Sequence, residues 1–142
     1  MEAGRVEGVL SLLRAKGGRI TTARRAILQA LCAHSEHPTA EQLTAAVQAK
    51  HPEVHESTVY RFLEDLEELG IIDHVHLGHG AAVYHFSDDT HYHLVCGTCG
   101  KVVQVPEEEF AALRKRLRRE HGFVMEQRHF ALAGRCVECS TK

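Results

Sequence analysis

The sequence predicts a mixed α/β (α+β) fold in two parts, a helical part that ends in a β-hairpin and a smaller β-β-α-β part. Three observations lead to this prediction. Four helical apolar patterns follow one another before residue 71. Two β-like runs then flank a Gly-x-Gly turn at residues 78–80. Residues 88–142 alternate short apolar runs with one highly charged helix, and they hold two Cys-x-x-Cys pairs.

Residues that favour helix starts and stops bound the four predicted helices. The glycines at 17–18 end the first helix, and Thr21 or Thr22 caps the second. Pro38 suits the start of the third helix, and Gly70 ends the fourth. We therefore expect helices over residues 6–16, 22–31, 38–50 and 56–69.

The third and fourth helices, separated by a short break, have the pattern of a helix-turn-helix. The first turns of the fourth helix carry side chains that can hydrogen-bond phosphates or base edges, namely Ser57, Thr58, Tyr60 and Arg61. The hairpin that follows is then the wing of a winged helix. We expect a winged-helix DNA-binding domain over residues 1–87. A plain helical core would show the same apolar pattern, and this alternative stays open here.

Charge and composition limit the class of protein. The net charge of −2 does not favour nucleic acid by itself, yet no acidic residue lies between Glu7 and Glu36, where five Lys or Arg residues fall. No apolar run approaches the length of a membrane helix, and the N-terminus lacks an apolar signal segment. We therefore expect a soluble, cytoplasmic protein without a membrane partner.

Residues 88–142 are predicted to form a small α/β dimerisation domain. Strands are expected at residues 93–95, 101–105 and 123–133. A helix from Pro106 is acidic at its start and basic at its end, which suits the helix dipole. Because so short a unit buries little core by itself, we expect a homodimer.

The two Cys-x-x-Cys pairs are the strongest chemical signal. Cys96 with Cys99 and Cys136 with Cys139 can place four thiolates about 2.3 Å from one structural Zn²⁺. The 36 residues between the pairs exceed the spacing of a simple zinc ribbon, so tertiary structure must join them. A redox Cys-x-x-Cys and four unrelated thiols are the alternatives. Cys32 is expected to be a small buried residue of the second helix.

Histidine is abundant, with 12 residues, and it is the commonest metal ligand. His74 with His76 and His91 with His93 stand at strand spacing, so each pair shares one face of its strand. The inferred hairpin register puts His85 on the face opposite the first pair, which suggests two separate metal sites. A surface or core role is the alternative for each pair. The remaining histidines without a partner are expected at the surface: His34, His51, His55, His79 and His121.

Taken together, these residues resemble the ferric uptake regulator (Fur) family. The resemblance is carried by the segment Thr58-Val59-Tyr60-Arg61, by residues 91–101 and by residues 134–139, and it spans about residues 9–139. The family consists of bacterial homodimeric repressors, and most of them bind DNA when a metal corepressor occupies a hinge site. The resemblance therefore implies a metal-responsive transcriptional repressor that binds double-stranded operator DNA as a homodimer.

The resemblance also implies roles for single residues. The structural zinc ligands correspond to Cys96, Cys99, Cys136 and Cys139. The hinge metal ligands correspond to His37, His85, His91 and His93. Together with the pattern of the fourth helix, the expected DNA-binding residues are Arg19, Arg24, Ser57, Thr58, Tyr60 and Arg61. The chain departs from many members at Ala23, where they have proline.

The wing is similar to the nickel-responsive (Nur) branch of the family, in which two wing histidines and a later one hold the metal. His74, His76 and His129 match those positions. Nickel is therefore the favoured regulatory metal, and zinc- or iron-responsive repressors are alternatives because imidazole sites bind all three metals. The branch has histidine at the position of Asp89, so either Asp89 or His85 completes the hinge site.

Peroxide-sensing members use carboxylates at the positions of His85 and Gln104, so the resemblance disfavours a peroxide sensor. Two other function classes are alternatives. A zinc enzyme would need an open position on the metal and a motif such as His-Glu-x-x-His, which the sequence lacks. A metal carrier would need no recognition helix. We therefore expect a regulator and no enzymatic activity.

Overall fold

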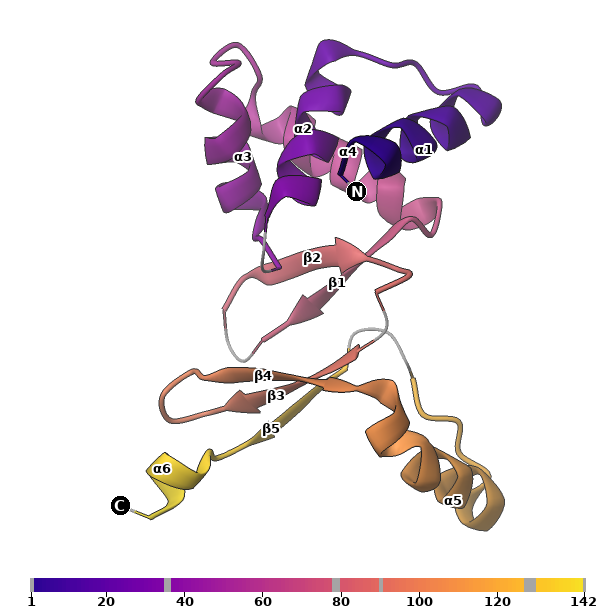
Figure 1. The fold of residues 1–142 in the computed structure, drawn as a ribbon, viewed down its shortest axis with the longest axis vertical. Coiled ribbons are helices and arrows are strands. Elements are labelled where there is room, and N and C mark those ends of the chain that lie inside the picture. Colours follow the sequence, from indigo (N-terminus) through magenta and orange to yellow (C-terminus); the bar gives the residue numbers. More distant parts are fainter. Residues whose placement is uncertain (1, 35–36, 78–79, 90, 127–129, 142) are drawn as a thin grey trace. The chain divides into compact units, whose positions relative to one another are not determined.

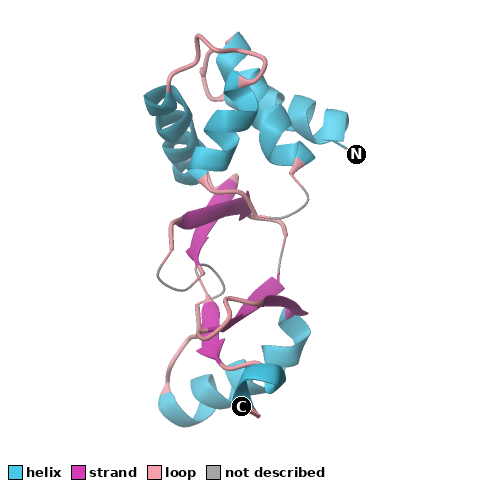
Figure 2. Cartoon of the chain, turned by 90° about the vertical axis from the view of Figure 1, so that its left-hand side faces the viewer, coloured by secondary structure: helices cyan, strands magenta, loops and turns pink. Residues whose placement is uncertain are grey.

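The computed structural model describes residues 2–34, 37–77, 80–89, 91–126 and 130–141. Four helices precede a two-stranded sheet, and a three-stranded sheet with further helices follows (Figures 1 and 2). This mixture of helices and small sheets confirms the predicted α+β class. Within the described ranges, none of the helices combines the length and the apolar character needed to cross a membrane.

The chain divides into two compact units. One comprises Met1–Ile72 and Val83–Phe86, and the other comprises Asp73–Ala82 and Ser87–Lys142. The hairpin thus contributes to both units, whereas the sequence suggested a single boundary after residue 87. That boundary stays a prediction.

Four helices precede the first sheet, and within the described residues two of them have side-chain caps at their starts. The helices are α1 (Glu2–Ala15), α2 (Thr22–Ala33), α3 (Ala40–Gln48) and α4 (Glu56–Glu68). The Thr21 hydroxyl accepts a hydrogen bond from the backbone N–H of Arg24 at 3.1 Å. Thr39 and Gln42 form a reciprocal capping box at the start of α3. The Thr21 and Thr39 caps confirm two of the predicted helix starts.

One apolar core joins these helices. Leu10, Ile27, Leu28 and Leu43 are each fully buried, and Leu63 of α4 packs in the same cluster. Each fully buried side chain of this kind contributes about 1.5–3 kcal/mol relative to an exposed one. Because Val59, Phe62, Leu63 and Leu66 all face this core, α4 is fixed with its opposite face toward solvent.

The predicted hairpin is present as a two-stranded sheet of β1 (Ile72–His76) and β2 (Ala82–Phe86). The residues of these strands differ in burial: Val75 and Val83 are buried, whereas His76 is exposed. The start of β2 is tied to the segment before α3. The backbone N–H of Tyr84 donates to the carbonyl of Pro38 at 2.8 Å, and Val83 bridges Thr39.

The second unit contains a three-stranded sheet in the order β4-β3-β5. Its strands are β3 (His91–Cys96), β4 (Val102–Pro106) and β5 (Ala131–Gly134), and β3 pairs antiparallel with β4 and parallel with β5. A 3₁₀ turn, η1 (Glu107–Phe110), leads into α5 (Ala111–His121), and the short α6 (Val137–Ser140) follows β5. Tyr92 packs edge to face against Phe110 and Phe130, with ring centroids 4.7 and 4.8 Å apart.

The predicted strand over residues 123–133 was wrong in its first half. The described residues 122–126 have no regular secondary structure, and β5 begins at Ala131. Gly122 adopts a left-handed conformation with φ 62°, and the N–H of Phe123 donates to the carbonyl of Leu117 at 3.2 Å. This helix cap turns the chain away from an extended path, and Phe123 and Val124 remain 59% and 71% exposed.

Candidate functional site

The four cysteines of the two Cys-x-x-Cys pairs meet at one end of the second sheet. Cys96 ends β3, and its strand pairing with Gly134 brings the chain after β5 alongside. The N–H of Gly97 donates to the carbonyl of Gly134 at 2.9 Å, and that of Cys96 donates to the carbonyl of Lys101 at 2.9 Å. The tertiary junction that the 36-residue spacing required is therefore provided by parallel pairing of β3 with β5.

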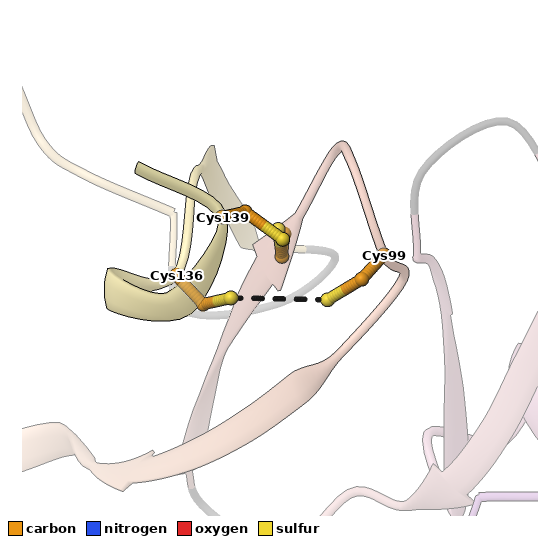
Figure 3. Close-up of side chains that lie close together, drawn as sticks. Cys99, Cys136 and Cys139 are labelled. Atoms are coloured by element: carbon orange, nitrogen blue, oxygen red, sulfur yellow. Dashed lines mark hydrogen bonds between the residues drawn. The ribbon is translucent and has the colours of Figure 1, made fainter. Parts of the chain in front are cut away.

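The cluster has the dimensions of a tetrahedral metal site. The sulfurs of Cys96, Cys99, Cys136 and Cys139 all lie within 4.8 Å of one another. The Sγ atoms of Cys99 and Cys136 are 3.8 Å apart (Figure 3). Four thiolates at about 2.3 Å from a central Zn²⁺ would stand about 3.8 Å from each other. The donor set and its spacing thus fit zinc.

Hydrogen bonding separates the proton affinities of these thiols. Backbone N–H groups of Cys136, Cys99 and Thr98 that point at its sulfur lower the pKa of Cys96 from 9.0 to about 5. Neighbouring cysteine side chains, Cys136 first, raise the pKa of Cys139 to about 12. The Cys96 thiol therefore ionises more readily than that of Cys139, and a divalent cation would favour the thiolate form of both.

A pair of imidazoles converges at the start of β3. The Nε2 atoms of His91 and His93 are 3.1 Å apart, and the side chain of His93 is nearly fully buried. The Nδ1 of His91 lies 3.2 Å from a carboxylate oxygen of Asp89. A carboxylate on the far nitrogen orients a ligating histidine in many metal sites. Two ring nitrogens this close together would both reach a single metal ion and would supply two of its ligands.

The first unit holds a second pair, His37 and His85. Their ring centroids are 5.0 Å apart. The hydrogen bond from Tyr84 to Pro38 brings the residue after His37 beside the residue before His85. The Nδ1 of His85 lies 3.0 Å from the carbonyl oxygen of Phe86, which favours a proton on Nδ1 and a lone pair on Nε2.

The wing histidines also lie together. His74 and His76 on β1 have ring centroids 5.6 Å apart in an edge-to-face arrangement. The third residue of the predicted wing site, His129, lies outside the described residues. The structure therefore brings together two of the three predicted wing ligands.

The start of α4 presents the polar side chains that the sequence pattern indicated. Ser57, Tyr60 and Arg61 are exposed, and Thr58 is half-buried. Arg19, between α1 and α2, is also exposed. These residues all belong to the first unit, and all have side chains of the kind that contact DNA.

Arg24 has a different environment from the other predicted DNA-binding residues. Its guanidinium donates to a carboxylate oxygen of Asp65 at 3.0 Å and stands 5.0 Å above the ring of Phe62. The sequence shows no sign of Asp65 as a partner, and it indicates Asp89 only as a candidate hinge ligand beside His85. The pairing of Arg24 with Asp65 joins positions 41 residues apart and depends on tertiary geometry, whereas Asp89 is a local neighbour two residues before His91.

The comparisons with known proteins agree with these features. The Ferric uptake regulator family matches residues 15–133. The chain is 31% identical over 142 residues to the peroxide operon regulator of Bacillus subtilis, an alignment that covers 100% of this chain and 98% of that protein. It is 29% identical over 137 residues to the peroxide-responsive repressor PerR of Staphylococcus saprophyticus, which covers 96% of this chain and 93% of that one.

Solved structures give the same result. The ferric uptake regulator from Pseudomonas aeruginosa with manganese matches at a TM-score of 0.72 and 31% identity, covering 89% of this chain and 96% of that one. The Helicobacter pylori ferric uptake regulator Fur matches at a TM-score of 0.81 over 99% of this chain and 94% of that one. At 19% identity, the second likeness shows the fold alone.

Proposed function

Because the chain belongs to the ferric uptake regulator family, we propose that it is a metal-responsive transcriptional repressor that binds operator DNA as a homodimer. The observation that carries the proposal is the combination of a Cys₄ cluster, to which Cys96 at the end of β3 contributes, and a pair of close histidines at the start of the same strand. The first would hold a permanent metal, and the second would hold an exchangeable one.

The Cys₄ cluster is proposed to bind structural zinc through Cys96, Cys99, Cys136 and Cys139. Four thiolates fill the tetrahedral positions of Zn²⁺, so no position remains for a reacting water molecule. A closed site of this kind supports the proposal that the protein is a regulator and not an enzyme. The metal would supply folding free energy to the small second unit.

The regulatory metal is proposed to take its hinge ligands from His37, His85, His91 and His93. Each pair is assembled within its own unit, so neither unit alone offers all four imidazoles. A metal that binds both pairs would link the units and favour one arrangement of them. Asp89 contacts the Nδ1 of His91, which supports an orienting role for this carboxylate and leaves His85 as the ligand.

A second regulatory site is proposed at His74, His76 and His129, with nickel as the favoured metal. The support is the convergence of two wing histidines and the resemblance of the wing to the nickel-responsive branch. The relatives described above are named for peroxide and ferric uptake, so they lend no support to nickel. Zn²⁺ and Fe²⁺ remain alternatives because imidazole ligands suit all three ions.

The wing proposal has a direct test. Replacing His74 and His76 together with alanine should abolish metal-dependent DNA binding while the dimer and its zinc are retained. The matched control replaces His51 and His55 of the first unit, which are predicted surface residues. Metal-dependent DNA binding that persists unchanged in the wing variant would rule out the wing site.

Uncovered apolar surface on the second unit supports the proposed dimer. Strand register aligns Leu94 with Val103 of β4 and with Leu132 of β5, which forms one apolar row across the sheet. Val103 and Leu132 are 40% and 48% exposed, and the row lines a hollow of about 210 Å³. A second copy of the chain would remove this row from water.

DNA contact is proposed for Arg19, Ser57, Thr58, Tyr60 and Arg61. The first turns of α4 would enter the major groove, and the dimer would present two such helices to half-sites about one helical turn apart, or a multiple of it. The regulatory metal would then act by fixing the spacing of the two helices.

The test of the proposed function begins with the metal content of the purified protein before and after dialysis against a mild chelator. Titration with Ni²⁺, Zn²⁺, Fe²⁺ and Mn²⁺ follows, with binding to an AT-rich palindromic duplex as the readout. One retained zinc per chain and a labile metal that switches DNA binding are expected. DNA binding that ignores every metal would contradict the proposal. Loss of an iron-dependent complex on adding peroxide would indicate a peroxide-responsive repressor instead.

A further inference from the structure

The guanidinium of Arg24 joins three segments of the first unit. Its Nη2 donates to the Asp65 carboxylate on α4 at 3.0 Å, and its Nη1 makes a longer hydrogen bond to the backbone carbonyl of Arg19 at 3.4 Å. The guanidinium carbon lies 5.0 Å from the ring centroid of Phe62, within the range of a cation–π contact. One side chain thus holds the segment between α1 and α2 against the recognition helix.

The backbone places this side chain with little freedom. Arg24 stands in the first turn of α2, where its N–H donates to the capping hydroxyl of Thr21. Gly18 passes close by, and a Cβ built on it would lie 3.6 Å from the Arg24 Nη1 and 3.0 Å from the carbonyl oxygen of Leu13. The segment that carries Arg19 is therefore packed tightly against the end of α1, and it lies in van der Waals contact with the Arg24 side chain.

The charge of Arg24 is compensated within the protein. Its side chain is 26% exposed and paired with Asp65, whereas Arg19 and Arg61 are exposed. Asp65 follows Arg61 by four residues, so the two lie on the same face of α4, one turn apart. Arg24 thereby engages a carboxylate that is a helical neighbour of a proposed DNA contact.

We propose that Arg24 is a positioning residue that sets the main-chain position of Arg19 relative to α4, and that it does not itself bind DNA. This inference rests on the proposed DNA-binding function. It assigns Asp65, an acidic residue near a DNA-binding surface, a favourable effect on DNA affinity. Simple charge repulsion predicts the opposite sign.

The positioning role predicts weaker DNA binding when the charge of Asp65 is removed, and charge repulsion predicts tighter binding, so an experiment can distinguish the two. The variants are Arg24→Lys, which keeps the charge but loses the two-pronged hydrogen bonding of the guanidinium, and Asp65→Asn, which removes the ion pair. The control is Glu64→Gln, which removes one exposed negative charge next to Asp65 on α4. The probe is a duplex that the wild-type protein selects from a random-sequence pool, and affinities are measured at one ionic strength with saturating metal, well below each variant's melting temperature.

The expected result is that Arg24→Lys and Asp65→Asn each weaken DNA binding about fivefold to tenfold, the effect of losing one hydrogen bond of ordinary strength. Glu64→Gln should bind as the wild type does, or more tightly. Tighter binding by Asp65→Asn, or wild-type affinity in Arg24→Lys, would overturn the positioning role. Lower melting temperatures with unchanged affinities would also overturn it, since the ion pair would then only stabilise the fold. A wild-type protein that selects no duplex would instead refute the proposed function and, with it, this role.

Discussion

At the scale of single residues, proximity decides the chemistry of the cysteines. Four sulfurs within 4.8 Å of one another cannot all carry charge without a cation, and backbone N–H groups already hold the pKa of Cys96 near 5. A divalent metal bound by the four sulfurs would remove this repulsion and would link β3 to the chain after β5. The cluster should therefore be both a metal site and a requirement for folding of the second unit.

Replacing Cys136 with serine should release the zinc and lower the melting temperature of the protein. One thiolate fewer leaves the tetrahedron open, and structural zinc contributes about 10–16 kcal/mol of binding free energy in small zinc domains. Elemental analysis and thermal unfolding provide the measurements. The matched control is Cys32→Ser, which should retain one zinc per chain. A Cys136→Ser protein with full zinc content would refute the site.

Cys32 should differ from the cluster in its reactivity. Burial raises the pKa of the Cys32 thiol above its usual 9.0. Because the thiolate is the nucleophile, a raised pKa leaves a smaller reactive fraction at pH 8, and this fraction grows as the pH rises through and beyond 9. In the zinc-loaded protein we expect one slowly reacting thiol whose labelling rate increases with pH, and four more after zinc removal. Rapid labelling at pH 7 that vanishes in Cys32→Ser would contradict this prediction.

The residues of the candidate sites differ in how far the sequence could predict them. The Cys-x-x-Cys pairs and the His-x-His pairs are local patterns, because turn and strand geometry bring residues two or three apart together. The ion pair of Arg24 with Asp65 joins positions 41 residues apart, so no local periodicity encodes it. The contact of Tyr84 with Pro38, which brings His37 near His85, has the same long-range origin.

At the scale of the elements, the predicted helices and the hairpin were confirmed because their signals are strong and local. Thr39 followed by Gln42 marks the start of α3, and Gly70, with φ 71°, follows α4. The strand predicted over residues 123–133 failed for the opposite reason. Its apolar residues suggested an extended run, but the α5 cap at Gly122 and the pairing partner on β3 decided where β5 begins.

The exposed face of the three-stranded sheet leads to a prediction about β5. Changing Leu132 to glutamate would place a charge in the apolar row that the partner is proposed to cover, at a cost of about 3–5 kcal/mol if the charge is buried unpaired. Such a cost corresponds to a dimer that dissociates at concentrations at least 100-fold higher than the wild type requires. Sedimentation equilibrium over a dilution series measures this shift.

The control for the β5 variant lies in the first unit. Leu12 of α1 is 51% exposed, similar to Leu132, so Leu12→Glu makes the same chemical change on a surface outside the proposed interface. It should leave the dimer intact. Equal dimer affinity for the wild type and Leu132→Glu would place the dimer interface elsewhere.

At the scale of the whole molecule, the proposed switch is a coupling between two binding events. If the regulatory metal raises the affinity for DNA by some factor, DNA must raise the affinity for that metal by the same factor. A factor of about 100 corresponds to about 2.7 kcal/mol, which lies within the usual range of allosteric couplings. Because the proposed hinge ligands are divided between the two units, the coupling should require both histidine pairs.

The DNA affinity with and without the regulatory metal, and the metal affinity with and without DNA, form a thermodynamic cycle. Measuring all four affinities tests the hinge separately from the Cys₄ cluster. His93→Ala removes a ligand from one pair, and His85→Ala removes one from the other. Each variant should keep its zinc and its basal, metal-free affinity for DNA, while the coupling factor falls toward one. The control is His121→Ala, an exposed residue at the end of α5. If only one of the two variants lost the coupling, the metal would be held within a single unit, and its effect on the spacing of the recognition helices would need a different physical cause.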